Sequence, residues 1–439
     1  MMPLPCVLMI TGSQIILVGT FISFFLIVYL IRKRVNFGFS LLLGSLLLAF
    51  FSLTSVPFEQ IIFAFLKATI YDVKTGTFVN DTFELAVLMT LIFMLASLMQ
   101  KTGAIKRLII SLRSLFSKGG TIGIIPAIYG LMPVPGGALF SAPSVKEEGE
   151  KFCINKDEQN FMNIWFRHIW FPIYPISMSI LVISGKDFSN ISVASLVIAN
   201  LVSFFVMIII GLFLLKRLIL KRNDSVKKNN NSRKKKDKDG LKFLLPPIVP
   251  VFFWVFYLIG LTSEKISFIF GVVFGIMLLY FLVNVSGKDF VEHIKSSLTW
   301  KYAILIIGIM VFREIFETST ANIVIFNLLE TLPIPFFYLL ILFPFLLGYV
   351  SGYILTGIVL TYPLLVPFFP LTSVTIVGIT SIIYISTFAG YLISPLHLCN
   401  VLSSDHLKTD TISMYRIFVP AAILMLIIQI TFISFFYSA

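Results

Sequence analysis

Long runs of apolar residues constrain this chain more than any other feature of its sequence. A helix needs about 20 apolar residues to cross the hydrocarbon core of a bilayer. The 439-residue chain, which is 58% hydrophobic and 13% charged, is therefore expected to be an all-α polytopic membrane protein embedded in a lipid bilayer. We expect about ten transmembrane helices, over residues 13–31, 36–55, 83–100, 163–184, 190–215, 243–260, 266–284, 300–316, 374–398 and 414–437.

Two further apolar stretches, 119–143 and 334–367, are interrupted by proline and glycine. The first contains "GLMPVPGGALFSAPSV", from Gly130 to Val145. Proline removes a backbone donor, and glycine costs about 1 kcal/mol in a helix interior. Non-helical backbone at membrane depth is tolerated only where protein buries it or where it lines a cavity. Both stretches are therefore predicted to be re-entrant hairpins that line a binding site.

The distribution of positive charge predicts the orientation. The segment 216–242 holds 12 basic and 3 acidic residues, and so carries most of the net charge of +13. Lys and Arg collect in cytoplasmic loops. If 119–143 is a hairpin, then Arg32–Arg34, the stretch 101–118 and this basic linker all lie on the cytoplasmic side. We therefore expect a multi-pass protein of the cell membrane with both termini outside and a cytoplasmic linker, and no nucleic-acid partner.

An internal repeat relates the two halves of the chain. At a shift of 220 residues, Gly137 falls on Gly357 and Pro175 on Pro395, and "PGGALFSAP" lies over "LTGIVLTYP". Each half has five expected spans and one hairpin, so the halves insert in opposite orientations, which is typical of secondary transporters. The predicted organisation is an N-terminal repeat (1–215, hairpin 119–143), the linker (216–242) and a C-terminal repeat (243–439, hairpin 334–367).

The motifs "GLMPVPGGALFSAPSV" and "GYLISPLHLC" carry a family resemblance. The chain resembles, over essentially its whole length, a prokaryotic integral membrane protein family known as domain of unknown function 401. That family belongs to the ion transporter superfamily, with gluconate, citrate and C4-dicarboxylate permeases as distant relatives. The resemblance implies an elevator-type carrier, in which a mobile domain moves against a scaffold, and a homodimer. The hairpin tips lack the Ser-Asn-Thr signature of the sodium-coupled dicarboxylate members.

The candidate substrate-binding residues lie at the two hairpin tips and on the two proline-broken helices that follow them. In "IWFRHIWFPIYPIS" and "AGYLISPLHLCN", ionisable and polar groups sit on membrane segments, where they are costly and commonly functional. Arg167 is an equal candidate for the site and for anchoring at the headgroups, whereas Arg313, Glu314 and Glu317 are expected to form a structural ion pair. The candidate set is Pro135, Gly136, Gly137, Ser141, His168, Tyr174, Ser177, Ser351, Gly352, Thr356, Gly357, Ser394, His397 and Asn400.

These features favour a secondary active transporter of a small, anionic, carboxylate-like solute. Coupling to H+ or Na+ is expected, and the intramembrane histidines favour H+. No other cofactor is expected, and the three scattered cysteines predict neither a disulfide framework nor a metal site. A channel is the first alternative. A membrane-embedded enzyme is less favoured, because the sequence has no "HExxH" or "GxSxG" motif.

Overall fold

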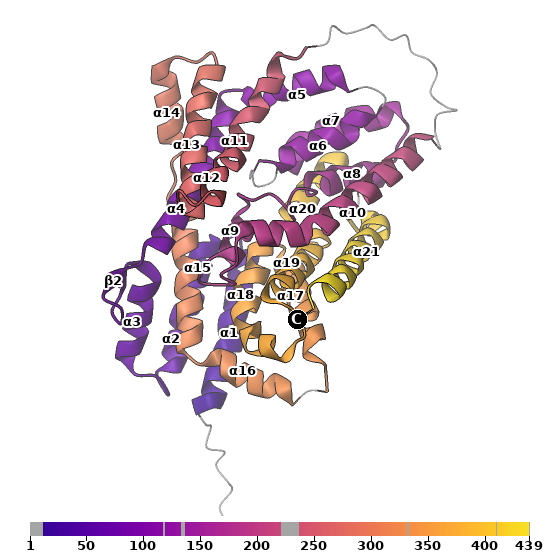
Figure 1. The fold of residues 1–439 in the computed structure, drawn as a ribbon. Coiled ribbons are helices and arrows are strands. Elements are labelled where there is room, and N and C mark those ends of the chain that lie inside the picture. The colour runs from indigo at the N-terminus through magenta and orange to yellow at the C-terminus, as the bar shows by residue number, and fades with distance from the viewer. Residues whose placement is uncertain are drawn as a thin grey trace, which may run out of the picture. The chain divides into compact units, whose positions relative to one another are not determined.

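A computed structural model describes residues 12–116, 119–132, 137–220, 237–331, 333–409 and 411–438. These residues form mainly helices, joined by loops and one two-stranded antiparallel hairpin (Figure 1). The first half contains α1 (Gly12–Arg32), α2 (Phe37–Ser52), α3 (Phe58–Thr69), β1 (Tyr71–Asp72), β2 (Thr77–Phe78), α4 (Asn80–Lys101), α5 (Ala104–Leu115), α6 (Gly120–Gly130), α7 (Ala138–Lys151), α8 (Lys156–Arg167), α9 (Met178–Ser184) and α10 (Val193–Leu220). The second half contains η2 (Asp239–Leu244), α11 (Leu245–Phe253), α12 (Val255–Leu258), α13 (Glu264–Leu282), α14 (Gly287–Ser297), α15 (Lys301–Thr318), α16 (Ala321–Glu330), α17 (Phe336–Ser351), α18 (Ile354–Leu365), η3 (Val366–Leu371), α19 (Ile376–Leu392), α20 (Leu398–Leu407) and α21 (Thr411–Phe436).

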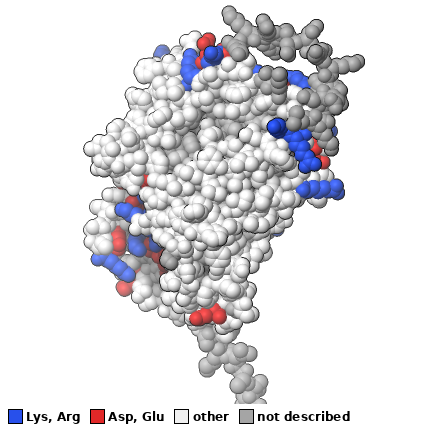
Figure 2. All heavy atoms as spheres, turned by 45° about the vertical axis from the view of Figure 1, so that its right-hand side comes forward, with Lys and Arg blue, Asp and Glu red and all other residues white. Residues whose placement is uncertain are grey.

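The helices agree with a polytopic membrane protein. Within the described residues, seven helical segments are long and apolar enough to cross a membrane. The exact number of ten spans stays a prediction, because several expected spans are short helices such as α2 and α19, and 163–184 is divided between α8 and α9. Many large apolar side chains are exposed, among them Phe25, Phe50, Phe213 and Phe281. Most of the face drawn in Figure 2 carries neither acidic nor basic residues, as expected of a surface that contacts lipid.

Each of the two predicted hairpins contains a pair of consecutive helices. In the first, α6 and α7 pack side by side (Figure 1), and in the second α17 is followed after two residues by α18. Each is followed by a helix that is interrupted at its prolines: α8 and α9 flank the first interruption (168–177), and α19 and α20 flank the second (393–397). The order of elements therefore recurs at roughly 220 residues, as the repeat predicts. Membrane re-entry and the opposite orientation of the halves stay predictions.

The described residues form two compact units, each built from both halves of the sequence. Unit 1 comprises residues 1–86, 301–339 and 359–372, and unit 2 comprises 87–300, 340–358 and 373–439. In unit 1, α15 packs on α2 and α3. Gly308 lies against the backbone of Gly38, where a Cβ atom would be 2.5 Å from the Gly38 oxygen. Only glycine permits two helices to approach so closely.

The expected ion pair of Arg313 lies within unit 1. Its guanidinium contacts Glu314 at 2.7 Å and Glu317 at 2.9 Å, and Lys67 on α3 reaches Glu314 at 2.9 Å. The Glu314 side chain is only 8% exposed. A buried carboxylate needs such partners, so these four residues join α3 to α15 and make a structural contact.

The amphipathic segment 101–118 contains helix α5, which packs on η2 within unit 2. The hydroxyl of Ser111 accepts a hydrogen bond from the Gly240 amide at 2.9 Å, and the Arg107 guanidinium lies over the Phe243 ring. The chain that leaves the basic linker is thus docked on α5. The second amphipathic segment, 315–332, contains the end of α15 and α16.

Candidate functional site

The start of α7 lies against a buried arginine. Helix α7 begins after Gly137, and a Cβ atom there would be 2.5 Å from Cζ of Arg167, at the end of α8. Arg167 is 3% exposed, and its Nη1 donates a hydrogen bond to the Tyr129 carbonyl at 2.9 Å. The guanidinium is therefore held inside unit 2, not at its surface. Pro135 and Gly136, which the sequence assigns to the site, lie outside the described residues.

Ser141 joins α7 to its neighbours. Its hydroxyl donates a 2.5 Å hydrogen bond to the Asn163 Oδ1, while the Asn163 Nδ2 donates to the Ala138 carbonyl at 2.9 Å and to Ser403 at 2.8 Å. Ser141, Asn163 and Ser403 are fully buried. These bonds connect α7, α8 and α20, so Ser141 supports the hairpin beside the candidate site. Sequence reasoning missed Asn163, although an amide side chain at the start of a predicted membrane span, 163–184, is itself a signal of a polar network.

The first chain break, 168–177, begins with His168. Its ring is fully buried, with Nδ1 2.6 Å from the Ile164 carbonyl and Nε2 3.3 Å from the Tyr391 hydroxyl. Side chains from other helices satisfy carbonyls of the break: Asn200 donates to the Pro172 carbonyl at 3.0 Å, and Tyr384 donates at 2.6 Å to the Phe171 carbonyl, which Pro175 leaves without a helical donor. Backbone groups without water need such partners in a membrane. The break is thus a fixed structure.

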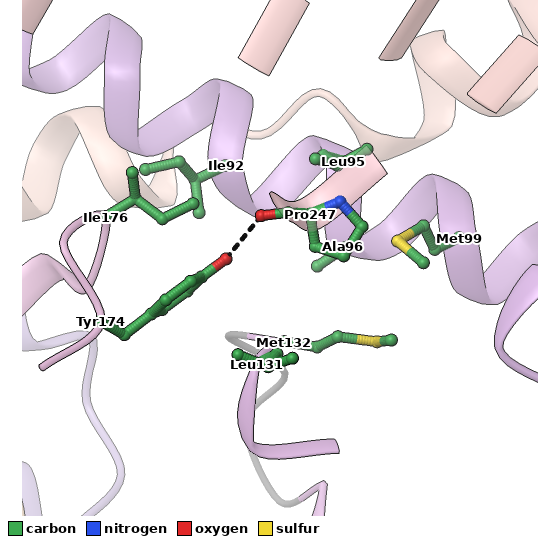
Figure 3. Close-up of a pocket in the computed structure, with 9 residues that line it drawn as sticks. All are labelled: Ile92, Leu95, Ala96, Met99, Leu131, Met132, Tyr174, Ile176 and Pro247. Atoms are coloured by element: carbon green, nitrogen blue, oxygen red, sulfur yellow. Dashed lines mark hydrogen bonds between the residues drawn. The ribbon is translucent and has the colours of Figure 1, made fainter. Parts of the chain in front are cut away.

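Tyr174 and Ser177 lie on this break but point elsewhere. Tyr174 donates a 2.9 Å hydrogen bond to the Pro247 carbonyl and borders an apolar pocket (Figure 3). The pocket lies between α4, the end of α6, the first break and α11, and is lined by Ile92, Leu95, Ala96, Met99, Leu131, Met132, Tyr174, Ile176 and Pro247. The Ser177 hydroxyl is 3.0 Å from that of Ser179. The structure does not bring these two residues to His168 and His397.

The turn of the second hairpin lies against the second chain break. Gly352 has a φ of 63°, and a Cβ atom there would be 2.7 Å from the Leu396 carbonyl carbon and 2.9 Å from the His397 nitrogen. Ser351 donates to the Leu347 carbonyl at 2.6 Å, which closes the last turn of α17. Glycine is therefore required at position 352 for two reasons: the backbone has a positive φ, and the second break packs against it too closely for a side chain.

Thr356 and Gly357 lie further along α18. A Cβ atom on Gly357 would overlap the Thr387 methyl group on α19, so this glycine permits close helix packing. Thr356 is fully buried, and its hydroxyl has no hydrogen-bond partner within the part of the chain that the structure describes. Of the residues predicted on α18, Thr356 is thus the one that offers an available polar group.

The second break, 393–397, is also stabilised by side chains. Ser394 donates to the Tyr349 carbonyl at 2.5 Å, and the Asn400 Nδ2 donates to Leu392 and Ser394 carbonyls at 2.9 and 3.2 Å. His397 is 1% exposed. Its two ring nitrogens make no hydrogen bond of good geometry within the described residues. Ser394 and Asn400 therefore hold the break in place, and His397 is the residue left to interact with something else.

The two breaks meet at what we call the histidine cluster: Arg167, His168, Tyr391, His397 and Cys399. The centroids of the two imidazole rings are 4.8 Å apart, and that of Tyr391 is 3.9 Å from that of His397. The positive charge of Arg167 acts on both imidazoles. Of the residues predicted for the site, Gly137, His168, Gly352 and His397 are thus brought together, one from each tip and one from each break.

Sequence reasoning missed two members of this cluster and left Arg167 undecided. Tyr391 precedes His397 by six residues, and Cys399 follows it by two. The sequence predicts no metal site, yet the ligand atoms of His168, His397 and Cys399 lie within 4.8 Å of one another. The available sequence signal for Cys399 was its position two residues after His397, in the "HLC" that follows Pro395. Its partner His168 is 231 positions away in the chain, so only the fold reveals the cluster.

Comparisons with known proteins agree with this fold. Eighteen solved chains match the structure. One is the crystal structure of the YdaH transporter of Alcanivorax borkumensis, which is described as having an unusual topology; the match has a TM-score of 0.60 and 12% sequence identity, and covers 89% of this chain and 97% of that one. No curated protein matches the sequence. The family described as "Protein of unknown function (DUF401)" matches residues 15–435. This match confirms the resemblance noted in the sequence: the chain belongs to the DUF401 family.

Proposed function

We propose that the protein is a secondary active transporter of a small organic anion, with a carboxylate-like group as the part that it recognises. The membrane-protein character of the chain and its structural similarity to the YdaH transporter support a role in transport. The substrate class comes from the histidine cluster and from the hairpin that lies against it.

The observation that carries the proposal is the contact between Gly137 and Arg167. A buried guanidinium and the N-terminal end of a 14-residue helix converge at one point. The guanidinium attracts negative charge because it is a cation. The first turn of the helix does so because it presents free N–H groups and the positive end of the helix dipole. Glycine leaves no side chain between them. A carboxylate is the group that this arrangement suits, because a guanidinium can bind its two oxygens together.

Alternating access by an elevator-type movement is the mechanism that we infer. Two compact units, each formed from both halves of the sequence, provide the separate bodies that such a movement needs. The candidate residues Gly137, His168, Gly352 and His397 all belong to unit 2. In this mechanism, unit 2 carries the anion and unit 1 provides the scaffold, in a homodimer. Transport is coupled to a gradient of H+ or Na+.

A ligand screen followed by transport measurements tests the proposal. Purified protein is heated with carboxylates, sugar acids and amino acids, with and without Na+, because a ligand that binds only the folded state raises the melting temperature. An anion that stabilises the protein is then offered to proteoliposomes under a pH gradient or a Na+ gradient. Saturable uptake driven by one gradient supports the proposal and identifies the coupling ion. Two results contradict secondary active transport. Either neither gradient raises the internal anion concentration above the external one, or the protein shows the conductance of an open pore.

A further inference from the structure

The two chain breaks bring together a set of metal-ligand atoms. His168 begins the first break, while His397 ends the second and Cys399 follows it on α20; all three side chains are buried. The ligand atom that each can offer lies within 4.8 Å of the other two. We propose that these residues form a binding site for a soft monovalent metal ion, Cu(I). The site shares His168 and His397 with the candidate anion site, but binding of Cu(I) does not require that the protein transports an organic anion.

His168 is held in the orientation of a metal ligand. The carbonyl oxygen of Ile164 can only accept, so Nδ1 at 2.6 Å carries the hydrogen, and Nε2 presents its lone pair to the cluster. Metal-bound histidines are commonly fixed in this way, by a hydrogen bond from the second ring nitrogen to a carbonyl or carboxylate. The Tyr391 hydroxyl lies 3.3 Å from Nε2, and a metal ion bound there would have to displace it.

His397 supplies a second, independent observation. Its imidazole is buried and interacts with the Leu392 carbonyl, but within the described residues neither nitrogen makes a hydrogen bond of good geometry. A buried polar group that lacks a partner is destabilising. Hydrogen bonds from Asn400 and Ser394 hold the backbone around it. The ring is thus kept in place while at least one of its nitrogens lacks a hydrogen-bond partner among the described residues, and a bound ion would provide that partner.

The ligand set and the surrounding charge select the ion. Thiolate favours Cu(I) and zinc, and imidazole binds both. Two neutral imidazoles and one thiolate give Cu(I) a complex with no net charge, whereas Zn²⁺ would leave a positive charge beside Arg167, at a cost in a buried site. Structural zinc also takes four protein ligands, and this cluster offers three of the kinds that bind it. Cu(I) is therefore the better match.

The geometry requires only a small adjustment. Ligands about 2.0–2.3 Å from an ion are roughly 3.5–4 Å from one another around it. The three ligand atoms, at separations of up to 4.8 Å, need to approach by about 1 Å, which side-chain rotation can supply. A bound ion would then join the two breaks directly, and the folded protein would become more stable.

The experiment measures Cu(I) binding to the full-length protein, purified without oxygen in detergent. Cys6 and Cys153 are replaced by serine so that Cys399 is the only thiol. A chromophoric Cu(I) chelator competes for the ion. We expect one Cu(I) per chain, an increase of several degrees in melting temperature, and an X-ray absorption spectrum that shows two nitrogen ligands and one sulfur. In the same background, Cys399→Ser and His397→Phe should each weaken binding at least tenfold.

Controls separate this site from the anion site and from misfolding. Arg167→Gln removes the residue that we place in the anion site, and should leave Cu(I) affinity equal or higher, because a repelling charge is lost. Cys399→Ser is close in size to the native residue, so it decides the question if His397→Phe fails to fold. The proposal is overturned if the protein binds no stoichiometric Cu(I), or if Cys399→Ser binds it with unchanged affinity. Four-ligand binding of Zn²⁺ in preference to Cu(I) overturns the choice of ion.

Discussion

At the scale of single residues, the candidate site depends on two glycines that lack a side chain as much as on its polar residues. Gly137 and Gly352 have no side chain, and this lets Arg167 and the backbone of His397 approach the two hairpin turns. Ser141, Ser351, Ser394 and Asn400 have their hydrogen bonds within the protein, so they position the site. The residues with the chemistry to bind a solute are therefore Arg167, the two histidines and Thr356.

Removing the charge of Arg167 should weaken anion binding strongly. A hydrogen bond to a charged group is worth about 1.5–3 kcal/mol, so Arg167→Gln is expected to raise the Kd of the transported anion by roughly 10- to 100-fold. Arg113→Gln is the matched control, since Arg113 is 40% exposed and pairs with Glu147. Binding is measured by the shift in melting temperature against anion concentration. Equal affinities of both variants would place the anion elsewhere.

Substitutions of Gly137 and Gly357 should differ in their effects. Gly137→Val displaces the Arg167 guanidinium and should abolish anion binding while the protein still folds. At Gly357 an added side chain meets the Thr387 methyl group, whose rotamer is fixed by a 2.8 Å hydrogen bond to Ile383. Overpacking of this kind costs about 1–3 kcal/mol, so Gly357→Val should also lower the melting temperature.

Thermal unfolding and anion binding are measured for both glycine variants. Gly287→Ala is the control, because a Cβ atom there is in ordinary contact, 3.4 Å from the Tyr280 hydroxyl. Wild-type binding by both valine variants would show that the hairpins have only a structural role.

At the scale of elements, the broken helices are stabilised by side chains from helices far away in the sequence. Asn200 on α10 holds the Pro172 carbonyl and accepts a 2.8 Å hydrogen bond from Ser381 on α19. Gln429 on α21 donates to Ser381 at 2.9 Å and accepts from the Ser203 hydroxyl at 2.7 Å. These four side chains are fully buried. The first break is thus fixed by a network that spans α10, α19 and α21.

A substitution that disrupts this network should destabilise unit 2 and leave the residues of the anion site unchanged. Gln429→Leu leaves Ser381 and Ser203 without their amide partner, and interhelical hydrogen bonds in membranes contribute about 0.6–2 kcal/mol each. We expect a lower free energy of unfolding, by about 1–3 kcal/mol, with little change in anion affinity. Gln100→Leu, at an exposed position on α4, is the control. Denaturant unfolding in detergent is the measurement, and equal midpoints for the two variants would contradict the network's role.

At the scale of the whole molecule, charge and repetition predict how the chain crosses the membrane. The basic linker 216–242 separates two halves with the same order of helices, hairpin and broken helix. If the halves insert in opposite orientations, as we predict, both hairpins enter the membrane from different sides. This predicted arrangement is the one that the proposed alternating-access mechanism requires.

The orientation can be tested with single cysteines in a cysteine-free variant. A cysteine at Ser232, in the linker, should react with an impermeant maleimide only after the cells are opened. A cysteine at Ser438, near the C-terminus, should react in intact cells. The reason is the preference of Lys and Arg for the cytoplasmic side. Labelling of Ser232→Cys in intact cells would reverse the predicted topology.

The sequence alone determined the class of the protein and the regions at which its helices break, whereas the re-entrant character of the two hairpins stays a prediction. These features are local: apolar length, proline and glycine act over a few neighbouring residues, and the 220-residue repeat is visible as a pattern. The tertiary structure decided which polar residues meet. Arg167 was equally compatible with the surface and the site, and only the packing of α7 on α8 shows it buried against Gly137. The pairing of His168 with His397 and Cys399 depends on two breaks separated by more than 200 residues, and the energy of such a contact arises only when the intervening helices have packed.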